Sequence, residues 1–245
     1  MFIRYKQDYP EYEEAKKIFT DIIHNDNCAT IAKENNFSFT GQSLFFLSFK
    51  MSLICDSILL TFMNDYSMHI LCRSIMEYYL KHFYIFYRFN ADKNDDIGKR
   101  FLGCTQGELY KKYNAVLWPD FIQPKPPEHK EWMANLKEFE IASILEYIGK
   151  IETIIDLSVR KGIQHAKLDY SIASSYVHGG CEAVFGEIKE HKIQLLSTIY
   201  MISTYFFTIQ TFTKFDSPNK KHIDSVRLKV QTLLDNSLAK YFPEK

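Results

Sequence analysis

The stretch from Ser67 to Phe89 constrains the fold of this chain most, because it is a long apolar segment that carries polar side chains at helical spacing. His69, Arg73 and Glu77 follow one another four residues apart, so on a helix they line one face. The apolar residues around them are Ile70, Leu71, Ile75, Met76, Tyr79 and Leu80. Because buried Arg and Glu are rare unless they are paired, we interpret Arg73 and Glu77 as a structural pair inside a helical bundle or as part of a site.

The rest of the chain also follows helical periodicity, and no segment shows the alternation typical of a strand. We predict an all-α protein, a single multi-helix bundle of seven or more helices. It would form one domain over 1–245, with a core at 40–215 and two terminal helices packed on it. The expected helices are 9–24, 41–63, 67–89, 97–117, 131–139, 141–159, 167–178, 182–215 and 220–241. Thr40 is the expected cap of the second helix, and 160–166 is expected to be a connection because it contains Gly162.

Charge and cysteine content narrow the class of protein. The chain has 30 Lys and Arg against 30 Asp and Glu, so no overall basic excess indicates nucleic acid, and such binding would need a local patch. The five cysteines are far apart and form no metal-binding spacing, which favours reduced thiols in a cytoplasmic protein. The N-terminal stretch is charged and has no apolar signal core, so we do not expect secretion.

Residues 193–212 raise the question of a membrane, because they contain no charged residue and have about the length of a spanning helix. Several Ser, Thr and Gln residues interrupt the apolar pattern. Such residues are penalised in a spanning helix, so we interpret the segment as a buried core helix and expect no membrane span.

His178 is the first candidate for chemistry. It ends a predicted helix before Gly179 and Gly180, and Ser175 lies one turn before it. The negative end of the helix dipole favours the protonated imidazole, and a histidine that titrates near neutral pH can move protons. The alternative is a capping histidine bonded to the last carbonyl groups of the helix.

Two further constellations involve histidine. Arg160 and His165 have the Arg-x(4–6)-His spacing of HEPN ribonucleases. His69, Glu77 and His178 could in principle hold a metal ion. The chain has no Gly-rich phosphate loop, no GxSxG and no HExxH motif, and we expect neither a metal nor a cofactor.

Two segments together resemble a known family. Residues 56–87 and 170–180 are similar to a bacterial family of helical proteins of unknown function. In that family, one helix carries the pattern Ala or Cys, Arg, Ser, any two residues and Glu. A second helix, far downstream, ends in the pattern Ser-x-x-His. Cys72, Arg73, Ser74 and Glu77 match the first pattern, and Ser175 with His178 matches the second. The resemblance covers the middle two-thirds of the chain and implies a helical fold with a polar site. That site is similar to the Arg and His site of HEPN toxin and antiviral ribonucleases.

The family itself implies a fold and a site but no reaction. By analogy with HEPN ribonucleases, we expect a metal-independent ribonuclease that acts as a toxin-type or antiviral effector. Arg73 would bind the phosphate, Glu77 would orient Arg73, His178 would transfer the proton and Ser175 would position His178. The expected substrate-binding residues are His69, Arg160 and His165. RNA would be the partner, and a homodimer would supply a composite basic cleft from a neutral chain.

The alternative is a non-catalytic helical binding or scaffold module. In that case Arg73, Glu77 and His178 form a buried polar network that fixes the register of the helices. The aromatic surface of the chain would then contact a partner protein.

Overall fold

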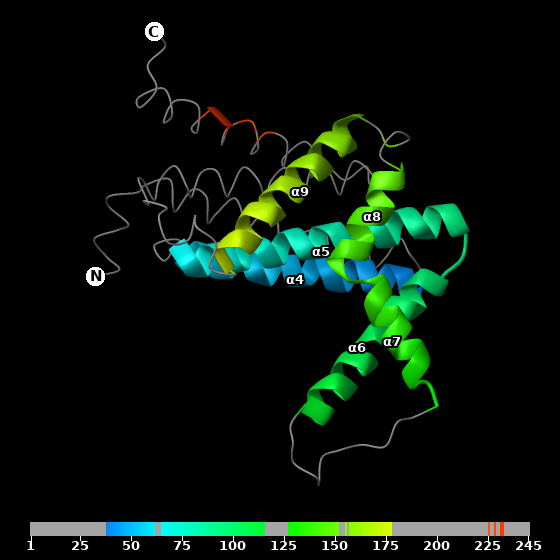
Figure 1. Cartoon of the computed structure of the whole chain (residues 1–245). Helices are drawn as coiled ribbons and strands as arrows, with labels where there is room; N and C mark the ends of the chain where they lie inside the picture. The colour runs from blue at the N-terminus through cyan, green and yellow to red at the C-terminus, as the bar shows by residue number, and fades with distance from the viewer. Residues whose placement is uncertain are drawn as a thin grey trace. The chain divides into compact units, whose positions relative to one another are not determined.

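The computed structural model describes residues 38–61, 65–115, 127–151, 155, 157–177, 225, 228, 231 and 232. Within these residues the chain is all-α, with no strand (Figure 1). Its helices are α4 (Phe39–Thr61), α5 (Asp65–Asp92), α6 (Asp96–Ala115), α7 (His129–Glu138), α8 (Ile141–Ile151) and α9 (Leu157–Val177). The predicted helices 9–24 and 182–215, and with them 193–212, lie outside the described residues.

The periodicity of the sequence located the first helices closely. The predicted helices 41–63, 67–89, 97–117 and 131–139 correspond to α4, α5, α6 and α7, and each end agrees to within three residues. The bundle of seven or more helices and the single domain stay predictions. Among the described residues no helix is long and apolar enough to cross a membrane.

The predicted connection at 160–166 is wrong. Helix α8 ends at Ile151 and α9 begins at Leu157, so the break falls inside the helix predicted at 141–159. Gly162 is buried in the interior of α9. A glycine costs a helix about 1 kcal/mol relative to alanine, and tertiary packing readily overrides so small a preference. Arg160, His165 and Ser175 therefore lie on one continuous helix.

The described residues group into two compact units, and α4 and α5 supply residues to both. The first unit contains the described residues of 48–79 and 155–232, and the second those of 38–47 and 80–151. In the first unit, α9 buries one face at Val159, Ile163, Ala166 and Ala173. Among the described residues, Cys55, Cys72 and Cys104 are buried and form no disulfide.

The second unit is held at one end by a carboxylate that caps a helix distant in the sequence. The amides of Phe39 and Thr40 donate to Asp95, and the Gly41 amide donates to Ser38 Oγ at 3.0 Å. The prediction that Thr40 caps α4 is therefore wrong: Ser38 and Asp95 accept from the free amides of the first turn. Gly98 of α6 lies so close that a Cβ there would overlap the backbone of Phe39 and Thr40.

The same unit packs α6 and α7 side by side (Figure 1). Gly107 permits this approach, because a Cβ there would lie 2.9 Å from the Leu136 side chain. The core residues of this unit include Leu80, Phe83, Ile85, Ile97, Phe139, Ile144 and Ile148.

Candidate functional site

Arg73 of α5 contacts α9 through Tyr170, 97 residues further along the chain. Its Nη2 donates a hydrogen bond of 3.2 Å to Tyr170 Oη. The guanidinium carbon also lies 5.3 Å from the centre of the Tyr170 ring, which is within the range of a cation–π interaction. Both side chains are half-buried. The polar stripe of α5 thus meets the helix that carries Ser175.

The predicted partner of Arg73 was Glu77, one turn further along α5. Of the residues that the structure describes, Tyr170 accepts the hydrogen bond from Arg73, and Glu77 does not. The Nε atom of Arg73 is buried and has no acceptor among the described residues. His69 and Glu77 are half-buried on the same helix. Spacing places these residues on one face but does not decide which side chain the guanidinium contacts.

The other predicted residues are distributed along α9. Arg160 is half-buried, and its Nη2 donates to the Ile155 carbonyl at 3.2 Å, just before the helix begins. Ser175 is half-buried near the end of α9. His165 lies in α9 but its side chain is outside the described residues, and so is the whole of His178. That Arg73 and His178 meet stays a prediction.

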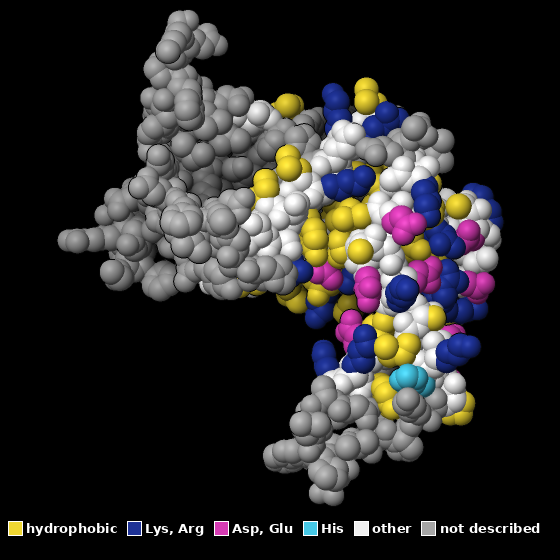
Figure 2. Space-filling model, in the orientation of Figure 1, with side chains coloured by type: hydrophobic (Ala, Val, Ile, Leu, Met, Phe, Trp, Pro, Cys, Tyr) yellow, Lys and Arg dark blue, Asp and Glu magenta, His cyan; other side chains and the backbone are white. Residues whose placement is uncertain are grey.

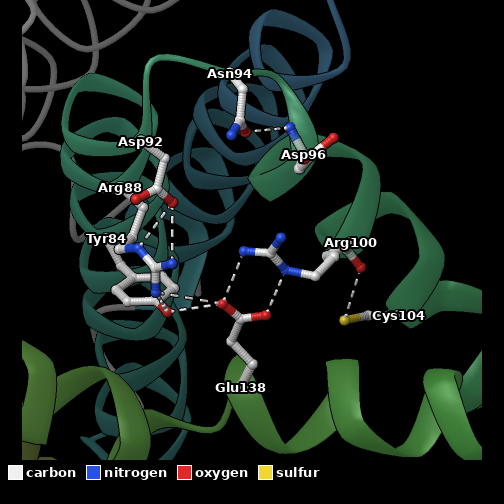
Figure 3. Close-up of polar contacts among 8 residues, drawn as sticks. All are labelled: Tyr84, Arg88, Asp92, Asn94, Asp96, Arg100, Cys104 and Glu138. Carbon is white, nitrogen blue, oxygen red and sulfur yellow. Dashed lines mark hydrogen bonds and ion pairs between the residues drawn. The ribbon is translucent and has the colours of Figure 1, made fainter.

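A second polar cluster, which the sequence analysis missed, surrounds Glu138 at the end of α7 (Figure 3). Arg100 donates to both oxygens of this carboxylate, from Nε at 2.7 Å and from Nη2 at 3.2 Å. Tyr84 Oη donates to Glu138 Oε1 at 3.0 Å and accepts from Arg88 Nη1 at 3.0 Å. Arg88 also donates to Asp92 from Nε and Nη2. The cluster links α5, α6 and α7.

The charges within this Glu138 cluster are balanced, since two guanidinium groups face two carboxylates. Arg88 also lies 5.6 Å from the centre of the Tyr147 ring. Burial and the nearby Glu138 carboxylate raise the pKa of Tyr84 to about 12, so its hydroxyl stays protonated near neutral pH. We interpret the cluster as a structural connection, because its members satisfy one another and Tyr84 is not poised to accept a proton.

Two other ionisable groups of the second unit are also unsuited to chemistry near neutral pH. Burial lowers the pKa of His82 to about 3, so its imidazole is neutral. Burial, with a contribution from Glu108, raises the pKa of the Cys104 thiol to about 12. Only thiolates are good nucleophiles, so Cys104 is an inert core residue.

No metal cluster marks a site on the described part of the chain, and the face shown in Figure 2 carries no large basic field. No group of three or more His, Cys, Asp and Glu side chains among the described residues could hold a metal ion. On the face shown in Figure 2, Lys and Arg side chains are mixed with Asp and Glu. The contact between Arg73 and Tyr170 joins α5 and α9, the two helices that carry the described residues of the predicted site.

Comparison of the chain with protein-family models, with curated proteins and with solved structures gives no match.

Proposed function

We propose that this protein is a HEPN-like, metal-independent ribonuclease that acts as a toxin-type or antiviral effector. The observation that carries the proposal is the contact between Arg73 and Tyr170. It joins the helix with the Arg-Ser-x-x-Glu pattern directly to the helix that leads into the Ser-x-x-His pattern. Ser175 is five residues beyond Tyr170, which is about 7.5 Å along a helix axis. Ser175, the first residue of the second pattern, thus lies on the helix that Arg73 contacts, which supports the proposal.

The chemistry would be an internal transfer of the RNA phosphodiester. Arg73 would bind the scissile phosphate and stabilise its added charge, with Glu77 orienting the guanidinium. His178, positioned by Ser175, would accept the proton of the 2′-hydroxyl. The bond from the 2′-oxygen to phosphorus forms, the bond from phosphorus to the 5′-oxygen breaks, and water supplies a proton to the leaving oxygen. His69, Arg160 and His165 would contact the strand.

The test is RNA cleavage by the purified chain in EDTA, with a thermal melt of every variant. We expect Arg73→Ala and His178→Ala to lose cleavage with at most a small fall in melting temperature, since Arg73→Ala removes the hydrogen bond to Tyr170. Lys161→Ala is the matched control, because it removes an exposed cation from α9 without touching the proposed site. Loss of cleavage in His165→Ala alone would move the site to the motif that begins at Arg160.

A non-catalytic binding or scaffold module is the second candidate. It is favoured by the engagement of Arg73 with Tyr170 and by the mutual pairing of charges around Glu138. Absence of cleavage by the wild type, with a large fall in melting temperature for Arg73→Ala, would select this function.

The ribonuclease proposal includes a homodimer, because a neutral chain would need two copies to build a basic cleft around RNA. The mass of the protein in solution, measured by light scattering with and without an RNA oligonucleotide, tests this part separately. A monomer that cleaves RNA would show that one copy suffices.

A further inference from the structure

Tyr170 holds the guanidinium of Arg73 by two contacts of different kinds. Its hydroxyl accepts the hydrogen bond from Nη2, and its ring lies against the guanidinium carbon. The first contact fixes the direction of one N–H group, and the second keeps the aromatic ring close to the cation. A long side chain that would otherwise sample many rotamers is thereby confined to one region.

The two contacts leave the positive charge of Arg73 uncompensated among the described residues. A guanidinium has five N–H donors, and the structure uses one of them, on Nη2. The contrast with Arg100 is direct, because Glu138 accepts from two nitrogens of Arg100 and neutralises its charge. A tyrosine hydroxyl is neutral, so Tyr170 positions the cation of Arg73 and keeps it available to an anion.

We propose that Tyr170 is the positioning residue of Arg73, and that the pair receives a phosphodiester group of an RNA strand. This inference rests on the ribonuclease proposal and gives Tyr170 a role in cleavage, which that proposal does not assign to it. Tyr170 acts through Arg73: because Arg73 Nε is buried and one N–H of Nη2 is bonded to Tyr170, the donors left for two phosphate oxygens are those of Nη1 and the second N–H of Nη2.

The test is a double-mutant cycle on RNA cleavage with Tyr170→Phe and Arg73→Lys. Tyr170→Phe retains the ring and removes the hydroxyl, and we expect kcat/KM to fall about tenfold. Arg73→Lys keeps the positive charge but replaces the planar guanidinium that Tyr170 orients with an ammonium group. In this background, Tyr170→Phe should therefore change kcat/KM by less than about twofold. Tyr78→Phe is the matched control, since it removes the hydroxyl of another half-buried tyrosine, on α5, and should cleave like the wild type.

The cycle separates a positioning role from a purely structural one. If Tyr170 only stabilised the fold, its replacement would reduce cleavage equally in both backgrounds and would lower the melting temperature. That result, or wild-type cleavage by Tyr170→Phe, overturns the role of Tyr170 and leaves the ribonuclease proposal standing. A wild-type chain that does not cleave RNA overturns the ribonuclease proposal itself, and the role of Tyr170 in cleavage with it.

Discussion

The carboxylate of Asp95 accepts a hydrogen bond of 2.7 Å from the backbone amide of Thr40, 55 residues earlier in the chain. Its second oxygen accepts from the amide of Phe39, also at 2.7 Å. Asp95 directly precedes α6, yet its side chain caps the first turn of α4. One residue therefore fixes the meeting point of two helix N-termini.

Replacing Asp95 by Asn should destabilise the protein by about 1–3 kcal/mol, because one amide of α4 loses its acceptor and the favourable charge at the helix end is removed. Urea unfolding followed by circular dichroism measures this change. Asp96→Asn is the control, since the Asp96 side chain is 58% exposed and pairs with Lys99 only at 3.6 Å. We expect that control to change stability by less than about 0.5 kcal/mol. Equal effects of the two variants would contradict the capping role.

The same contact predicts a dependence of stability on pH. Burial alone would raise the pKa of Asp95, but the hydrogen bonds from Thr40 and Phe39 outweigh it and hold the pKa below its ordinary value of 3.8. A lowered folded-state pKa means that this contribution to stability is complete above pH 3.8 and is lost as the pH falls through the folded value. The difference in unfolding free energy between wild type and Asp95→Asn should therefore shrink over that range. A difference that stays constant as the pH falls would show that ionisation of Asp95 is not involved.

Gly98→Ala should destabilise the protein by about 1–3 kcal/mol, although alanine is the better helix former. The reason is the close approach of α4, whose backbone at Phe39 and Thr40 occupies the space of the new methyl group. Gly149→Ala in α8 is the matched control, because no atom lies within 4 Å of a Cβ at that position. The control should gain about 0.5–1 kcal/mol. Thermal or urea unfolding of the two variants should therefore show shifts of opposite sign, and a gain in both would contradict the packing of α4 on α6.

Most helices of the described chain were predictable because amphipathic periodicity is a local property. The helix predicted at 67–89 appears as Asp65–Asp92, extended at both ends. The interruption before α9 was misplaced, because Gly162 was read as a local break while its burial in the fold permits a helix. Local propensity could not have revealed that burial.

The candidate site was predictable only in part, since spacing identifies residues on one helix and not their partners on another. The spacing along α5 singled out Arg73 with Glu77, whereas its contact with Tyr170 depends on the packing of α5 against α9. The pairs of Arg88 with Tyr84 and Asp92 were readable as neighbours one turn apart. Glu138 could not be predicted as a partner of Arg88 and Arg100, because residues so far apart in the sequence give no local signal of contact.

Glu138→Gln should destabilise the protein by about 1–3 kcal/mol, because Arg100 loses the carboxylate that accepts from two of its nitrogens. The expected loss is smaller than for a fully buried pair, since the Glu138 side chain retains 22% exposure and Arg88 keeps Asp92 as its partner. Glu146→Gln provides the control: Glu146 and Lys150 form a 2.7 Å ion pair in which both side chains are 70% exposed, and so exposed a pair contributes little to stability. Urea unfolding of both variants measures the two losses. A loss for Glu138→Gln no larger than that of the control would mean that α5, α6 and α7 are held together by apolar packing alone.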